Sequence, residues 1–119
     1  MNILLIEDTE SVFSTWQDQL EANGHEVHIA TTPEKALTVF RERNWDIIVL
    51  DGCIGGHEFN CLPVLKEIRK SFSGPIVAAS SDEELRASMM IQGCTHESPK
   101  PYVLAELRGI IDFELSKPS

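Results

Sequence analysis

Basic residues are scarce in this sequence: 10 Lys and Arg stand against 19 Asp and Glu in 119 residues, a formal net charge of −9 at pH 7. Proteins that hold a nucleic-acid backbone or an anionic membrane surface do so with clustered Lys and Arg. The composition therefore argues against direct binding to nucleic acid or to a membrane. Long apolar runs are missing too. No stretch approaches the roughly 18 residues of a membrane span, and the apolar run that opens the chain ends at Glu7, too short for a signal-peptide core.

Cysteine is also sparse, and its pattern fits no zinc site. The three cysteines, Cys53, Cys61 and Cys94, are odd in number, which favours a reducing, cytoplasmic location over a disulfide framework. On a helix, Cys53, His57 and Cys61 would form one stripe able to bind a soft metal. The glycine pair between Cys53 and His57 argues against a helix there, so ordinary loop and packing roles are favoured.

What the sequence does have is enough apolar side chains for one core. Hydrophobic residues make up 42% of the chain, which excludes disorder, and the length suits one domain spanning residues 1–119. That leaves no room for an effector domain, so we expect any output to require a partner or a further domain.

Short apolar runs alternate with helical patterns along the whole chain. Five runs read as strands: Asn2–Ile6, Glu26–Ala30, Asp46–Leu50, Pro75–Ala79 and Thr95–Ser98. The helix after the fourth run, Asp82–Gln92, is weakly patterned, and the last helix, Tyr102–Leu115, is expected to bury four residues: Leu104, Leu107, Ile111 and Leu115. Five such units predict an α/β fold with a doubly wound parallel sheet.

Ligands of doubly wound sheets bind at the carboxyl ends of the strands. The residues that follow the predicted strands are all polar there: Glu7, Asp8, Asp51, Ser80 and Lys100. Three carboxylates in one crevice repel each other, and a hard cation such as Mg²⁺ relieves that repulsion. A cation, an ammonium group and a hydroxyl are three ways to stabilise a transferring phosphoryl group. Aspartate can form an acyl phosphate, and Asp51, at the end of the most apolar strand, is the best candidate nucleophile.

These motifs, taken in order, resemble the receiver domain of two-component response regulators over essentially the whole chain. The motifs are Glu7-Asp8, Asp51 after DIIVL, Ser80 in PIVAASS and Lys100-Pro101. The resemblance implies a flavodoxin-like, three-layer sandwich with strand order 2-1-3-4-5. It also implies that Asp51 accepts a phosphoryl group, that Lys100 pairs with it, and that Ser80 hydrogen-bonds it and moves on activation.

The same resemblance implies a cofactor and partners. Mg²⁺ would be held directly by Asp8, Asp51 and the backbone carbonyl of Cys53, with Glu7 acting mainly through water. A histidine kinase or phosphotransfer protein would supply the phosphoryl group, and a downstream effector or output domain would respond. The chain would then be a phosphoacceptor that assists its own phosphorylation and dephosphorylation rather than an enzyme. A homodimer would use the face of the fourth helix, fifth strand and fifth helix, which offers Met89, Met90, Glu97 and Tyr102. For Met89, a role as a core residue is favoured over a surface contact.

Three features depart from the receiver pattern. Ile54-Gly55 stands where receivers carry Met-Pro, and His57–Asn60 replaces the usual Asp-Gly, so we expect a more mobile loop. Glu97 occupies the position of the usual aromatic switch residue, and an unpaired acid there cannot turn inward. The short spacing from Ser80 to Lys100 predicts a short or irregular fourth helix.

Two other functions remain open at this point. One is a receiver-like adaptor that is never phosphorylated, which Glu97 and the altered loop favour and the intact five-residue set opposes. The other is a haloacid-dehalogenase-type hydrolase, which needs a second Asp where Cys53 stands. A dinucleotide or flavin site is disfavoured, because no Gly-rich turn follows the first strand.

Overall fold

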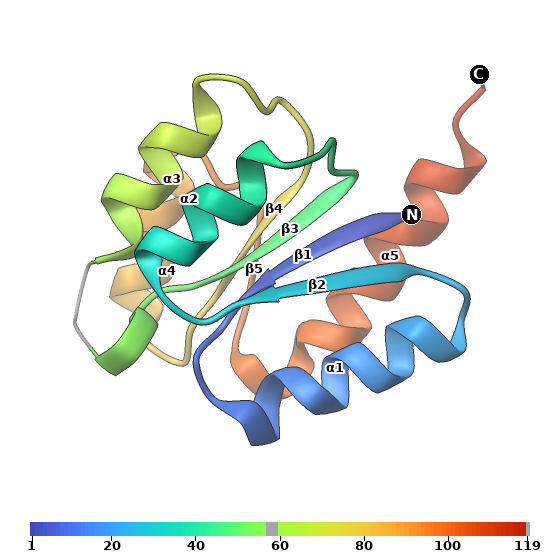
Figure 1. The fold of residues 1–119 in the computed structure, drawn as a ribbon, viewed down its shortest axis with the longest axis horizontal. Helices are drawn as coiled ribbons and strands as arrows, with labels where there is room; N and C mark the ends of the chain where they lie inside the picture. The colour runs from blue at the N-terminus through green and yellow to red at the C-terminus, as the bar shows by residue number, and fades with distance from the viewer. Residues whose placement is uncertain (57–59, 119) are drawn as a thin grey trace.

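The computed structural model describes residues 1–56 and 60–118 as a parallel sheet between two layers of helices (Figure 1). The strands are β1 (Asn2–Ile6), β2 (Glu26–Ala30), β3 (Ile47–Asp51), β4 (Ile76–Ala79) and β5 (His96–Ser98). The α-helices are α1 (Glu10–Ala22), α2 (Pro33–Arg41), α3 (Cys61–Arg69), α4 (Glu83–Gln92) and α5 (Val103–Ser116). Two short 3₁₀ turns, η1 (Ile54–Gly56) and η2 (Lys100–Tyr102), follow β3 and β5. None of these helices is long and apolar enough to cross a membrane.

The strand order is β2-β1-β3-β4-β5, and all four pairings are parallel. The predicted α/β class and strand order are therefore confirmed. β3 lies at the centre with all five residues buried, whereas the more polar β2 forms an edge, as its composition indicates. Because the strands are parallel, all five carboxyl ends meet at one edge of the sheet.

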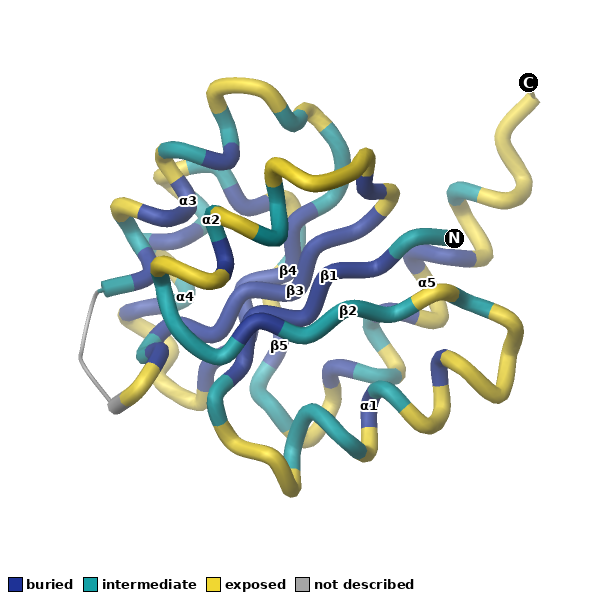
Figure 2. Tube along the Cα trace, viewed as in Figure 1, coloured by how far each residue is buried: buried dark blue, intermediate teal, exposed yellow. Residues whose placement is uncertain are grey.

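Each face of the sheet has its own hydrophobic core. Side chains alternate along a strand, so Ile48 and Leu50 of β3 pack under α2, α3 and α4, while Ile47 and Val49 pack against α1 and α5. Burial follows this arrangement: the middle strands are buried along their length (dark blue in Figure 2), and the outer faces of the helices are exposed (yellow). The sheet that carries the carboxyl ends of the strands is therefore packed on both faces.

Helix boundaries follow the local signals in most places. The Thr32 side chain accepts a hydrogen bond from the backbone N–H of Lys35 at 3.1 Å, with Pro33 in the first turn of α2, as predicted. Asp82 caps α4 by accepting from the N–H groups of Glu84 and Leu85 at 3.0 and 3.2 Å. α4 is an unbroken helix of ten residues, one longer than α2 and α3, so the prediction of a short or irregular helix is wrong.

Of the side chains that the sequence singles out on α4 and α5, one prediction needs correction. Leu115 was expected inside α5 but is 66% exposed, because Val103, Leu107, Ile110 and Ile111 already complete the buried face. Met89 is completely buried in the core under α4, as its interpretation as a core residue predicts, whereas Tyr102 is exposed. The spacing of apolar residues predicts which face of a helix is buried to within one turn. How far that buried face continues along the helix depends on the extent of the sheet beneath it.

Candidate functional site

Three carboxylates meet at the carboxyl edge of the sheet, next to the centre. Glu7 follows β1, Asp51 is the last residue of β3, and the two strands are neighbours in the sheet. One carboxylate oxygen from each of Glu7, Asp8 and Asp51 lies within 4.8 Å of the other two. Glu7 and Asp51 are buried, and Asp8 is half-buried. The sequence-predicted acidic group is thus brought together in one place.

Lys100 reaches the same cluster from the far end of the chain. It lies in η2 just after β5, and its Nζ is 3.1 Å from Glu7 Oε2 and 3.2 Å from Asp51 Oδ1. The Lys100 side chain is 29% exposed. One ammonium group therefore bridges two buried carboxylates and leaves the third, on Asp8, without this partner.

The cluster is under electrostatic strain. Burial, with the nearby charge of Asp51, raises the pKa of Glu7 despite the opposing effect of Lys100. Burial also raises the pKa of Asp51, even though Lys100 and the N–H of Cys53 favour its charged form. For Lys100, burial alone would lower the pKa, but Asp51 and Glu7 outweigh it and raise that pKa. Negative charge is in excess here, which is the condition that a bound cation relieves.

The two oxygens of Asp51 have different surroundings. Oδ1 accepts from the backbone N–H of Cys53 at 3.1 Å and contacts Lys100. Oδ2 is buried and has no hydrogen-bond partner among the residues that the structure describes. Such a buried oxygen is costly unless something binds it. An all-oxygen donor set in which three carboxylates face one ammonium group fits Mg²⁺.

Ser80 completes the set at the end of β4. The N–H of Gly52 donates to the Ala79 carbonyl at 3.2 Å, which places Ser80 beside the residue that follows Asp51. The side chain of Ser80 is buried, and its Oγ accepts from the N–H of Asp82 at 3.1 Å. All five strand-end residues singled out in the sequence therefore lie at the same edge of the sheet.

The family follows from a direct comparison. The sequence model of the response regulator receiver domain matches residues 3–112. The chain belongs to this family. Receiver domains bind Mg²⁺ at an acidic site and interact with histidine kinases and output domains, and they are generally phosphoacceptors rather than classical enzymes.

Known relatives are similar at low identity. The KDP operon transcriptional regulatory protein KdpE of Escherichia coli is 24% identical over 120 residues, covering 99% of this chain and 52% of that protein. The transcriptional regulatory protein AfsQ1 of Streptomyces coelicolor is 33% identical over 76 residues, covering 64% of this chain and 33% of that protein. The chain therefore spans about half or less of the length of these relatives.

Solved structures share the fold at still lower identity. A two-component response regulator from Clostridium difficile has a TM-score of 0.85 at 20% identity, covering 98% of this chain and 99% of that one. The receiver domain of a sensor histidine kinase from Pseudomonas aeruginosa has a TM-score of 0.82 at 21% identity and covers 98% of both chains. That structure has a magnesium ion coordinated in its active-site cleft.

The loop after Asp51 in this receiver is organised by a residue that the sequence reading missed. The Asn60 side chain accepts from the N–H of Ile54 at 2.9 Å and donates to the carbonyl of the same residue. The N–H of Gly55, whose φ is +71°, donates to Asp8 Oδ2 at 3.0 Å. No sequence signal identifies such a clamp, because Asn is common in loops. The predicted mobility of this loop is untested, since His57, Glu58 and Phe59 lie outside the described residues.

The cysteines and Glu97, which the sequence also singles out, have clear positions in the structure. Cys53 lies in the bend after β3 and Cys61 begins α3, so these two residues do not share a helix, while His57 lies outside the described residues. The role of the Cys53 carbonyl as a ligand stays a prediction. Glu97 points to solvent with a side chain 45% exposed and pairs with Arg86, as expected for an acid that cannot turn inward.

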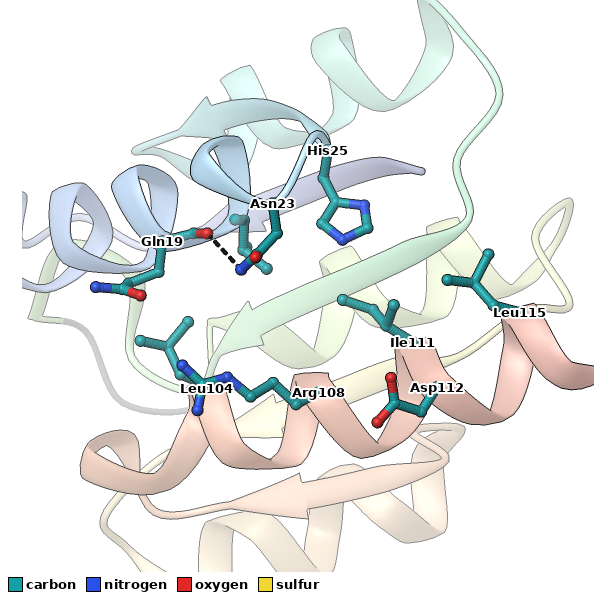
Figure 3. Close-up of a pocket in the computed structure, with 9 residues that line it drawn as sticks. Gln19, Asn23, His25, Leu104, Arg108, Ile111, Asp112 and Leu115 are labelled. Carbon is teal, nitrogen blue, oxygen red and sulfur yellow. Dashed lines mark hydrogen bonds between the residues drawn. The ribbon is translucent and has the colours of Figure 1, made fainter.

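A separate cavity of about 350 Å³ lies between the end of α1 and α5 (Figure 3). Asn23 and His25 line one side of it, and Leu104, Arg108 and Ile111 line the other. These residues belong to the turn before β2 and to α5, and none of the acidic-site residues lines the cavity. The cavity is therefore not part of the acidic site.

Proposed function

We propose that this receiver domain accepts a phosphoryl group on Asp51 from a phosphohistidine. The observation that carries the proposal is the asymmetry of the buried Asp51 carboxylate. Its Oδ1 is held by the Cys53 N–H and Lys100, whereas Oδ2 is unpaired among the described residues and available to attack phosphorus. In the reaction an Asp51 oxygen forms the new O–P bond, the N–P bond of the donor breaks, and its electron pair returns to the imidazole.

The surrounding side chains have separate roles in this proposal. Lys100, already 3.2 Å from Asp51, places a positive charge beside the phosphoryl oxygens. The Ser80 hydroxyl accepts from Asp82, which leaves its proton to donate to one of those oxygens. Asp8, Asp51 and the Cys53 carbonyl would hold Mg²⁺ directly, with Glu7 behind them through water. The bound ion supplies positive charge that neutralises the equatorial oxygens during transfer.

The partners follow from this chemistry. The donor is a sensor histidine kinase or a histidine phosphotransfer protein, and the recipient of the signal is an effector protein or an output domain. The half-length match to transcriptional regulators is consistent with an output domain elsewhere. A homodimer through α4, β5 and α5 is a further part of this proposal, and no direct contact with nucleic acid or membrane is expected from residues 1–119, given the net charge of −9.

The test is chemical labelling. Incubation with radiolabelled acetyl phosphate and Mg²⁺ is expected to give an acid-stable, base-labile label on the wild-type chain. Asp51→Asn should take up none. Asp112→Asn, which removes an exposed carboxylate on α5, serves as the matched control and should label as wild type does. Absence of label on the wild type, or equal label on Asp51→Asn, contradicts the proposal.

A second function is favoured by one observation. Glu97 is solvent-facing and paired with Arg86, so the position that carries the aromatic switch in typical receivers has no aromatic ring here. A non-phosphorylated adaptor with the same fold would keep the interaction surface and lose the chemistry. That adaptor predicts no label under the conditions above.

A further inference from the structure

The guanidinium of Arg86, on α4, connects two elements that border the acidic site. Its Nη1 donates to the Ser80 carbonyl at 2.7 Å, and its Nε donates to Glu97 Oε1 at 3.2 Å. The Arg86 side chain is only 12% exposed, so solvent screens this pair less than an ordinary surface ion pair. A planar guanidinium donates in fixed directions and therefore holds both partners in one relative position.

Ser80 is the residue whose position Arg86 controls most directly. Its N–H donates to the Ser98 carbonyl of β5 at 3.2 Å, which ties one side of the residue to the sheet. Its hydroxyl accepts from Asp82, and its carbonyl accepts from Arg86. β4 ends at Ala79, so the Ser80 carbonyl lies beyond the strand, where the Arg86 side chain takes it up.

We propose that Arg86 is a positioning residue that holds Ser80 beside Asp51, and that Glu97 anchors Arg86 from β5. The inference rests on the proposed phosphoryl transfer, in which the Ser80 hydroxyl binds a phosphoryl oxygen. A displacement of about 1 Å in a positioned group can reduce a rate by up to roughly 100-fold. A guanidinium fixed on the neighbouring carbonyl prevents such a displacement.

The same contacts link the site to the outer surface of the protein. If Ser80 moves toward a phosphoryl group, its carbonyl moves relative to Arg86, and the Arg86–Glu97 pair must adjust. Arg86 lies on α4 and Glu97 is exposed on β5. The pair therefore conveys a shift at Ser80 to the α4–β5 surface without an aromatic side chain.

Rates of Asp51 phosphorylation by acetyl phosphate, measured against donor concentration at saturating Mg²⁺, test the inference. Arg86→Ala is expected to lower the maximal rate by roughly tenfold, with little change in the half-saturating donor concentration. Arg86→Lys should recover part of the loss, because a lysine can reach only one of the two partners. Glu97→Gln should lower the rate by about twofold to threefold, because it keeps an acceptor and loses the charge.

Two further variants separate positioning from a general loss of stability. Arg43→Ala removes a more exposed Arg–Glu pair at the opposite end of the sheet, where Arg43 contacts Glu26 at 2.8 Å, and its rate should stay within about twofold of wild type. The double variant Arg86→Ala/Glu97→Gln should be no slower than Arg86→Ala alone, because Glu97 acts through Arg86.

Amide hydrogen exchange gives a readout that does not depend on phosphorylation. In Arg86→Ala the amides of Ser80 and Asp82 should exchange faster, while those of β1 keep their wild-type protection. A wild-type rate in Arg86→Ala overturns the inference. If that variant does not fold, wild-type rates in both Arg86→Lys and Glu97→Gln overturn it. If the wild type takes up no label, the proposed function fails, and unchanged exchange at Ser80 and Asp82 then refutes the positioning role separately.

Discussion

Replacing Asp51 by Asn is expected to stabilise the metal-free chain, although it alters the candidate phosphoacceptor. Asp51 is 1% exposed, burial raises its pKa, and its Oδ2 has no hydrogen-bond partner among the described residues. An amide removes the charge, keeps an oxygen for the Cys53 N–H, and brings two N–H donors of its own. The charged side chain is therefore a source of instability that Asn largely removes.

The magnitude follows from the distances in the cluster. With an effective dielectric constant near 20, the 3.2 Å contact to Lys100 contributes about −5 kcal/mol. Repulsion from Glu7 and Asp8, each within 4.8 Å, contributes at least about 3.5 kcal/mol apiece by the same formula, less for half-exposed Asp8. The two repulsions together, up to about 7 kcal/mol, exceed the attraction to Lys100, and the desolvation of the carboxylate adds to the net cost. We expect Asp51→Asn to raise the free energy of unfolding by about 1–3 kcal/mol.

Urea unfolding in EDTA, followed by circular dichroism, measures the difference in the free energy of unfolding between Asp51→Asn and the wild type. Thermal unfolding provides a second measurement, because Tm should shift by about 4 °C per kcal/mol. Asp112→Asn is the control, because it makes the same change in net charge at an exposed position on α5. Added Mg²⁺ should stabilise the wild type by mass action and Asp51→Asn much less. The two curves of stability against Mg²⁺ should therefore converge or cross.

Two results would refute the reasoning. If Asp51→Asn is less stable than wild type in EDTA, the Lys100 contact outweighs desolvation and the electrostatic account of the cluster is wrong. If Asp112→Asn gains as much as Asp51→Asn, the effect belongs to the overall charge of −9 and not to the site.

Three other predictions concern stability. The folded state raises the pKa values of Glu7 and Asp51 above 4.5 and 3.8, so the contribution of these groups to the free energy of unfolding is present at low pH and is lost as pH rises through the raised values. The metal-free wild type should therefore lose stability over that pH range relative to the double variant Glu7→Gln/Asp51→Asn. Equal profiles of stability against pH for the two proteins refute this. Asn60→Ala removes both hydrogen bonds to the buried Ile54 and should cost about 1–3 kcal/mol in urea unfolding. Thr32→Ala removes the α2 cap and should cost about 1 kcal/mol, with Thr32→Ser restoring it.

The fold could be predicted because two patterns dominate the sequence, namely short apolar runs and segments with helical spacing of apolar residues. The run Ile47–Leu50 is apolar at every position, which is typical of a strand covered on both faces, and the strands alternate with helices, of which α2 and α4 begin at side-chain caps. The site was predictable for the same reason. Residues that end parallel strands must share an edge, so the positions of Glu7, Asp51 and Lys100 followed from topology without any knowledge of side-chain conformation.

Side-chain contacts that cross between loops and helices were not predictable in this way. Asn60 clamps Ile54, and Arg86 bridges Ser80 and Glu97, through hydrogen bonds whose geometry depends on the final packing of α3 and α4. In the sequence, Arg86 is one of many charged residues with helical spacing, and nothing sets it apart. Leu115 shows the complementary error, since its spacing is correct and only the extent of the underlying sheet leaves it exposed.

We expect stability and ligand binding in this receiver domain to depend on the same few oxygens. The buried carboxylates of Glu7 and Asp51 raise the energy of the metal-free fold because they have too few donors, and the proposed cation would bind there for the same reason. Variants selected for stability in EDTA should therefore accumulate neutral residues at these positions and lose their response to Mg²⁺. Selection in excess Mg²⁺ should retain both carboxylates, because the bound ion then supplies the compensation that the protein lacks. If selection in EDTA leaves Glu7 and Asp51 unchanged while stabilising mutations arise elsewhere, this coupling between stability and binding is refuted.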